Sequence, residues 1–154
     1  MAPHVWLADF DEAETVGGLL AQFRTFYGRE WPSDNAFIAA VEKLMESNGA
    51  EFLLGSVHAD APPAGVCQLR YRFSTWTAAD DCWLEDLFVT GEARGSGLGR
   101  ALVETAVSRA KEHGCRRIEL DTDDANAPAM RLYESAGFAP KQADGTPVYL
   151  QRHL

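Results

Sequence analysis

A glycine-rich turn between a predicted strand and a predicted helix constrains this chain most strongly. The turn, Arg94-Gly-Ser-Gly-Leu-Gly-Arg100, follows a strand expected at 82–89 and leads into a helix expected at 98–113. The first N–H groups of a helix have no partner inside it, and together with the helix dipole they favour an anion. Glycines let this backbone approach a pyrophosphate closely. The turn therefore predicts a site for a phosphorylated ligand, with Arg94 and Arg100 adding positive charge.

Two other phosphate-binding motifs fit this turn poorly. A P-loop requires Gly-Lys followed by Ser or Thr, whereas Gly99 is followed by Arg100 and Ala101. A dinucleotide fingerprint requires a third glycine where Arg100 stands. Asp121 lies near the acidic position of that fingerprint, but the polar link at 90–93 separates the strand from the turn. The sequence therefore disfavours both nucleoside triphosphate and dinucleotide ligands.

Hydrophobic periodicity predicts a mixed α/β chain whose strands cluster in the middle. Strands are expected at 4–8, 51–59, 65–75, 82–89, 115–122 and 148–152, and helices at 11–27, 33–45, 98–113 and 127–136. The three consecutive strands between 51 and 89 predict an antiparallel meander. A chain of 154 residues fits one fold, so a single domain over 1–154 is expected.

Charge and composition narrow the class of partner. A net charge of −9 argues against nucleic acid, because phosphate binding is driven by clustered Lys and Arg. No stretch approaches the roughly 18 consecutive apolar residues of a membrane span, and the N-terminus does not resemble a signal peptide, so a cytoplasmic protein is expected. Cys67, Cys82 and Cys115 show neither disulfide nor zinc spacing, and the four histidines are scattered, so no metal is predicted.

Two motifs carry a resemblance to a known family. The segment Arg94-Gly-Ser-Gly-Leu-Gly99 resembles the Gln/Arg-x-x-Gly-x-Gly/Ala signature of the GNAT superfamily of N-acetyltransferases, and the strand Trp83–Val89 precedes it at the usual spacing. Asn126, followed seven residues later by Tyr133 and then by Gly137-Phe138, resembles the second block of that family. The strand end Phe73-Ser-Thr-Trp76 and the segment Leu84-Glu-Asp-Leu-Phe-Val89 are also similar to the diamine (spermidine/spermine) N-acetyltransferase branch.

The resemblance implies a fold and a co-substrate. The fold is a single-domain GNAT-like α/β (α+β) fold, a twisted mixed sheet that splays open at the cofactor site and is flanked by about four helices. The co-substrate is acetyl-coenzyme A (acetyl-CoA), and family members often dimerise, so a homodimer is expected. The implied coenzyme-binding residues are Leu87, Phe88, Val89, Arg94, Gly95, Ser96, Gly97, Leu98, Gly99, Arg100, Asn126, Ala129 and Tyr133.

Acyl transfer to an amine needs a neutral amine and a proton for the leaving thiolate. The branch resemblance places the base at Glu85, directly or through a water, with Asp86 helping to hold a cationic amine. Adjacent strand residues point to opposite faces, so at most one of these carboxylates is expected to face the acceptor. The resemblance makes Tyr133 the acid, and no His or Asn partner for a cysteine is legible, so direct transfer is expected. Trp76 and Tyr27 are further candidates for the acceptor pocket.

Each of these side chains also has an ordinary structural interpretation. Glu85 and Asp86 fit plain strand-end carboxylates, and Tyr133 fits a core aromatic residue at helical spacing. The resemblance implies an N-acetyltransferase for the primary amine of a small molecule: a polyamine, an amino acid or a related amine. Acetylation of a protein N-terminus or lysine, and a catalytically silent acetyl-CoA-binding module, remain alternatives. The sequence does not identify the acceptor, because this fold serves enzymes with unrelated substrates.

Overall fold

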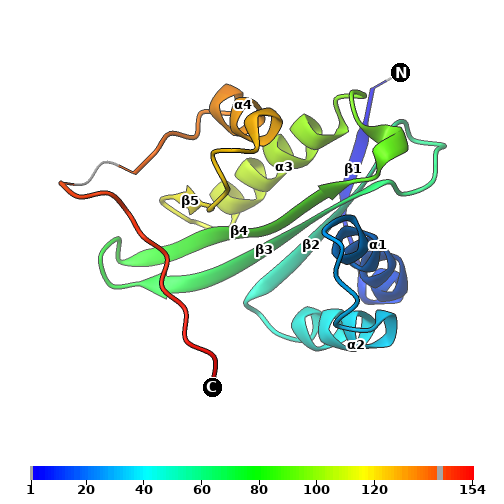
Figure 1. The fold of residues 1–154 in the computed structure, drawn as a ribbon, viewed down its shortest axis with the longest axis horizontal. Coiled ribbons are helices and arrows are strands. Elements are labelled where there is room, and N and C mark those ends of the chain that lie inside the picture. The colour runs from blue at the N-terminus through cyan, green and yellow to red at the C-terminus, as the bar shows by residue number, and fades with distance from the viewer. Residues whose placement is uncertain (1, 142–143) are drawn as a thin grey trace.

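Helices cover both faces of one five-stranded sheet in the computed structural model, which describes residues 2–141 and 144–154 (Figure 1). The strands are β1 (His4–Leu7), β2 (Ala50–Ser56), β3 (Gly65–Ser74), β4 (Ala79–Val89) and β5 (Ile118–Glu119), and this is also their spatial order. The helices are α1 (Ala13–Phe26), α2 (Asp34–Met45), α3 (Leu98–Glu112) and α4 (Ala127–Ser135), with single 3₁₀ turns at Phe10–Glu12 and Gly91–Ala93. The predicted α/β class is confirmed.

The sheet is antiparallel from β1 to β4, as the predicted meander requires, and β5 then joins β4 in parallel. The β4–β5 ladder consists of Cys82 opposite Ile118 and Trp83 opposite Glu119. Beyond Trp83 the two strands separate, and the edge of β4 that faces β5 pairs with no strand of the described residues. This separation is the predicted splay of the sheet.

Two of the predicted strands are corrected by the structure. The strand expected at 115–122 is reduced to Ile118–Glu119, because β4 and β5 diverge and Leu120–Asp123 line a cavity in place of pairing. The strand expected at 148–152 is wrong. Val148, Tyr149 and Leu150 are 75%, 81% and 85% exposed, and no described strand pairs with them. An apolar run forms a strand only where a neighbouring edge accepts its backbone hydrogen bonds.

Each face of the sheet carries its own apolar core. Helices α1 and α2 pack on one face, as Figure 1 shows, and α3 packs on the other. The buried residues of the α1–α2 face include Val16, Leu20, Val41, Phe52, Leu54, Val66 and Phe88. Those of the α3 face include Leu53, Cys67, Leu69, Leu84, Leu98, Leu102 and Ala106. In the described part of the chain, no helix combines the length and the apolar composition of a membrane span.

Two glycines opposite each other let α3 approach the sheet closely. Gly55 pairs with Gly65 across β2 and β3. A Cβ atom at Gly55 would lie 2.6 Å from Leu98 Cδ1, and one at Gly65 would lie 2.8 Å from Leu102 Cδ1, both far inside van der Waals contact. The first turns of α3, which follow the glycine-rich turn, are therefore fixed against the sheet by direct contact with strand backbone.

Candidate active site

The glycine-rich turn ends at the N-terminus of α3. Gly95 and Gly97 have φ angles of +78° and +85°, in the left-handed region that glycine adopts without a steric penalty. The first i to i−4 hydrogen bond of the helix is donated by the Ala101 N–H to the Gly97 carbonyl, at 3.0 Å. The N–H groups of Gly99 and Arg100 precede it and have no acceptor inside the helix. This is the backbone arrangement that an anion-binding turn requires.

The two arginines that flank the turn are engaged by other protein groups. Arg94 Nε donates to the Val89 carbonyl at 3.2 Å, and the guanidinium lies 4.4 Å from the centroid of the Phe26 ring. Arg100 pairs with Glu104 at 2.8 Å and donates to Ser135 Oγ at 3.1 Å. The Arg100 side chain therefore joins α3 to α4, while Arg94 holds a carbonyl on the open edge of β4.

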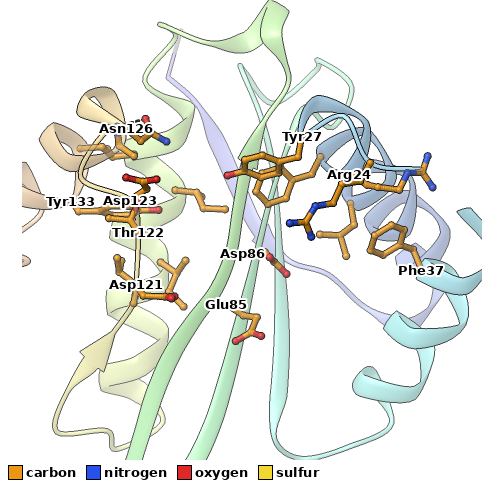
Figure 2. A pocket seen from close by; sticks show the side chains of 18 of the residues that line it. Arg24, Tyr27, Phe37, Glu85, Asp86, Asp121, Thr122, Asp123, Asn126 and Tyr133 are labelled. Carbon is orange, nitrogen blue, oxygen red and sulfur yellow. Dashed lines mark hydrogen bonds between the residues drawn. The ribbon is translucent and has the colours of Figure 1, made fainter. Parts of the chain in front are cut away.

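A cavity of about 450 Å³ fills the split between β4 and β5 (Figure 2). Residues of α1 and α2 form one wall, β4 lies in the middle, and the segment from β5 to α4 forms the other wall. Trp76 is not part of this cavity, since it lies on the β3–β4 hairpin and is 93% exposed. Of the predicted site residues, the cavity gathers Tyr27, Glu85, Asp86, Leu87, Asn126, Ala129 and Tyr133.

Glu85 and Asp86 line the same cavity, so the expectation that these adjacent side chains point to opposite faces of the strand is wrong. The β3–β4 register shifts between Gln68, which is opposite Asp86, and Leu69, which is opposite Leu84. Glu85 is therefore the extra residue of a β-bulge, which bends the strand and re-aims its side chains. Figure 2 shows both carboxylates projecting from β4 into the region between the two walls.

The two carboxylates have different surroundings. Glu85 is exposed, whereas Asp86 is half-buried. Burial, together with the negative charge of Glu85, raises the pKa of Asp86 to about 6. No ion pair or hydrogen bond within the described residues neutralises Asp86. A cation that enters the cavity therefore meets a carboxylate that changes its charge just below neutral pH.

Tyr133 faces the cavity from α4. Burial, followed by the charges of Cys67 and Tyr27, raises the pKa of Tyr133 to about 12, so its hydroxyl stays protonated at neutral pH. Its ring meets Phe138 edge-on, with the ring centroids 5.9 Å apart. The Asn126 side-chain oxygen caps α4 by accepting from the Ala129 N–H at 3.3 Å. The cap and the edge-on contact fix the helix that presents the hydroxyl.

The three cysteines lie outside the cavity lining. Burial raises the pKa of Cys67 and of Cys115, and it raises the pKa of Cys82 to about 12. A protonated thiol is a poor nucleophile, and this supports direct transfer over an acyl-cysteine route. Within residues 2–141 and 144–154, no three His, Cys, Asp or Glu side chains are grouped to hold a metal ion.

Sequence reasoning missed several residues of the cavity. Arg24 and Phe37 reach it from α1 and α2, and only the packing of those helices beside β4 brings them there. A general rule of sheet topology could have pointed to Asp121, Thr122 and Asp123, because these residues follow a strand that runs parallel to β4. The carboxyl ends of parallel strands meet at one edge of a sheet, where ligands commonly bind.

Comparisons of the sequence with known proteins identify a family. The sequence profile of the Acetyltransferase (GNAT) family matches residues 16–138. The streptothricin acetyltransferase of Streptomyces lavendulae is 30% identical over 149 residues, which cover 83% of this chain and 77% of that protein. The thialysine N-epsilon-acetyltransferase of Sus scrofa is 33% identical over 84 residues, 51% of this chain and 49% of that protein, so the chain spans only about half of this relative.

A solved structure shares the fold. The aminoglycoside N-acetyltransferase AAC(6')-Iy, in complex with CoA, superposes with a TM-score of 0.75 and 20% sequence identity. The superposition covers 97% of this chain and 95% of that chain. The two proteins therefore share one overall fold.

Proposed function

The chain belongs to the acetyltransferase (GNAT) family, and from this premise we propose that it is an acetyl-CoA-dependent N-acetyltransferase acting on the primary amine of a small molecule. The proposed acceptors are polyamines, amino acids and related amines, and transfer is direct. One observation carries the proposal: the cavity in the β4–β5 split joins two β4 carboxylates with the Tyr133 hydroxyl. Amine acylation by a thioester needs a base and an acid that meet at one place.

The open edge of β4 and the glycine-rich turn support the proposed place of the coenzyme. Backbone groups of Leu87–Val89 that face away from β3 pair with no strand of residues 2–141 and 144–154, and they suit the amides of a pantetheine arm. The glycine-rich turn at 94–100 comes after β4 in the chain, and its backbone N–H groups suit the pyrophosphate of the coenzyme. An amide that binds the Val89 carbonyl displaces Arg94, whose guanidinium then stays beside the turn as a partner for phosphate.

The proposed chemistry uses three side chains, and acetyl-CoA supplies the acetyl thioester. Asp86 holds the acceptor as a cation, and Glu85 takes a proton from the amine, directly or through a water. Tyr133 gives its hydroxyl proton to the leaving sulfur as the C–N bond forms and the C–S bond breaks. The ammonium group loses two protons on becoming an amide. Glu85 takes the first and leaves a neutral nucleophile, and the second leaves the nitrogen after the C–N bond has formed and returns to the Tyr133 phenolate. The net products are the amide, free CoA and one proton on Glu85.

The acidic lining of the cavity supports a cationic acceptor. Asp121 and Asp123 line it together with Glu85 and Asp86, as Figure 2 shows. Clustered carboxylates raise the local concentration of a positively charged amine. The two curated relatives described above, named for streptothricin and thialysine acetylation, also support a small-molecule acceptor.

Acetylation of a protein N-terminus or lysine stays a second candidate, because part of the cavity lining is open to solvent. Tyr27 and Trp31 belong to the lining and are 62% and 82% exposed, so an extended chain has access to the cavity beside them. A silent acetyl-CoA-binding module and a homodimer are also compatible with the family. The presence of both Glu85 and Tyr133 in one cavity disfavours the silent module.

The proposal is tested by CoA thiol release from acetyl-CoA with polyamines, amino acids and aminoglycosides, followed by mass spectrometry of the acetylated amine. We expect turnover with at least one of these amine classes. Acetylation of peptide N-termini or lysines, without turnover of any small amine, would support the second candidate. Coenzyme binding without turnover of small amines, peptides or proteins would support the silent module.

A pH profile tests the role of Asp86. Below a pH of about 6 Asp86 is protonated and cannot hold a cationic amine, so kcat/KM is expected to rise through that pH. Asp86→Asn should abolish this rise of kcat/KM. Glu85→Gln should keep the rise but move it to lower pH, because the charge of Glu85 helps to raise the pKa of Asp86, and it should also lower kcat. A rise of kcat/KM near pH 6 that persists in Asp86→Asn would contradict the role proposed for Asp86.

The same carboxylate is expected to affect stability. Folding raises the pKa of Asp86 above its ordinary value, so its contribution to stability falls as the pH rises from about 4 to about 6. Asp86→Asn removes this loss, and we expect it to raise the free energy of unfolding by about 1–2 kcal/mol at pH 8 and by much less at pH 4. Urea unfolding at the two pH values measures the difference.

A further inference from the structure

A second hollow of about 380 Å³ adjoins the cavity. Its lining consists of Arg70, Tyr71, Arg72, Trp83 and Glu85. Glu85 belongs to the linings of both spaces, so the two meet at the β-bulge. On β3, Gln68, Arg70 and Arg72 share one face of the sheet, and Gln68 is the residue opposite Asp86. An acceptor bound at Asp86 can therefore extend along this face toward the two arginines.

Arg70 and Arg72 are cations that form no ion pair within the part of the chain that the structure describes. Both are exposed, and no ion pair or side-chain hydrogen bond of the described residues engages either of them. Asp81, which lies opposite Arg72, is already bound by Arg117 at 2.8 Å. Residues two apart on a strand lie about 7 Å from each other on the same face, so the like charges add to each other's potential. Such a pair in a chain of net charge −9 favours an incoming anion.

We propose that Arg70 and Arg72 bind a carboxylate of the amine acceptor, so that the acceptor is a zwitterion such as a free diamino acid or a short peptide. The inference rests on the proposed function and narrows its substrate class. Arg70 stands two residues beyond the position opposite Asp86 and Arg72 stands four beyond it, which places them about 7 and 13 Å along the strand. A lysine-like molecule, or a peptide of roughly two to four residues, covers that span.

A carboxylate fits this place better than a phosphate. The arginine fork accepts either group in bidentate geometry. Glu85 lies in the same hollow, however, and it repels a phosphate dianion about twice as strongly as a carboxylate. The indole of Trp83, opposite Arg70, offers an apolar wall to the carbon chain that joins the amine to the carboxylate.

Matched acceptors that differ only in the carboxylate test the inference. We would compare lysine with its decarboxylated form, cadaverine, and triglycine with triglycine amide, by CoA thiol release. In the wild-type protein, kcat/KM should be about tenfold higher for the carboxylate-bearing member of the pair that is turned over. Arg70→Gln with Arg72→Gln should remove this preference through a higher KM, and should leave the carboxylate-free member within about twofold.

The control variant is Arg116→Gln, which removes one positive charge from an exposed arginine that lines neither space, and it is compared with each of the single variants Arg70→Gln and Arg72→Gln as well as with the double variant. It should leave the preference unchanged. Equal kcat/KM for both members of a pair in the wild-type protein overturns the carboxylate site and leaves the proposed function intact. Turnover of no amine at all contradicts the proposed function. If the double variant does not fold, the comparison of the paired acceptors with the wild-type protein still tests the carboxylate site.

Discussion

Gly97→Asp is expected to abolish acetyl-CoA binding while the protein stays folded. Gly97 is the residue that precedes the first turn of α3, and a Cβ atom there would have only Pro3 Cγ near it, at 3.8 Å. The new carboxylate would stand at the N–H groups proposed for the pyrophosphate. Two like charges about 4 Å apart near a protein surface repel by about 4 kcal/mol, so affinity should fall at least about 100-fold. Isothermal titration with acetyl-CoA measures the loss.

Gly114→Asp is the matched control for this variant. Gly114 follows the opposite end of α3, its φ of +84° nearly equals the +85° of Gly97, and a Cβ atom there has open space. The two variants therefore carry a similar backbone strain of about 1–2 kcal/mol and the same added charge. Acetyl-CoA should bind Gly114→Asp with wild-type affinity. If Gly97→Asp binds acetyl-CoA with wild-type affinity, the coenzyme does not bind at this turn.

Tyr133→Phe is expected to lower kcat about 100-fold and to leave acetyl-CoA affinity within about threefold. The ring keeps its contact with Phe138, so the change removes only the hydroxyl that gives a proton to the leaving sulfur. With its pKa raised to about 12, Tyr133 stays protonated across the working range, so its loss should lower kcat to a similar extent from pH 6 to pH 9.

Tyr149→Phe provides the matched control for the loss of a tyrosine hydroxyl. Tyr149 is 81% exposed and lies outside the cavity lining, so this change should leave both kcat and KM unaltered. An unchanged kcat in Tyr133→Phe would mean that another group protonates the leaving thiolate. A large loss of coenzyme affinity in that variant would indicate a binding role in place of the acid role.

Local signals in the sequence were sufficient to predict most of the elements. Ser33 caps α2 by accepting from the Ala36 N–H at 3.2 Å, and the helix Asp34–Met45 lies within the range predicted at 33–45. The length of β5 and the absent strand at 148–152 depend on a neighbouring edge far away in sequence. A single strand pattern carries no information about that edge, so these two predictions failed.

The site could be predicted in part. The glycine-rich turn and the helix of Tyr133 follow from local spacing, and the structure places Tyr133 and Asn126 at one cavity. The bulge at Glu85 could not be foreseen, because it arises from a mismatch in register between β3 and β4 and not from the β4 sequence alone. The position of Arg24 in the cavity lining could not be predicted from the sequence either, because it depends on how α1 packs. Whether the carboxylates and Tyr133 act as proposed stays a prediction.

Titration of the wild-type protein with acetyl-CoA, followed by thermal unfolding, tests the central claim most directly. A ligand that binds only the folded state at about 100 times its dissociation constant adds roughly 2.7 kcal/mol of stability, so Tm should rise by several degrees. Acetyl-CoA should raise the Tm of the wild-type protein by this amount and should leave the Tm of Gly97→Asp unchanged. No rise in the wild-type protein at saturating acetyl-CoA would contradict the proposed coenzyme site and the transfer reaction built on it.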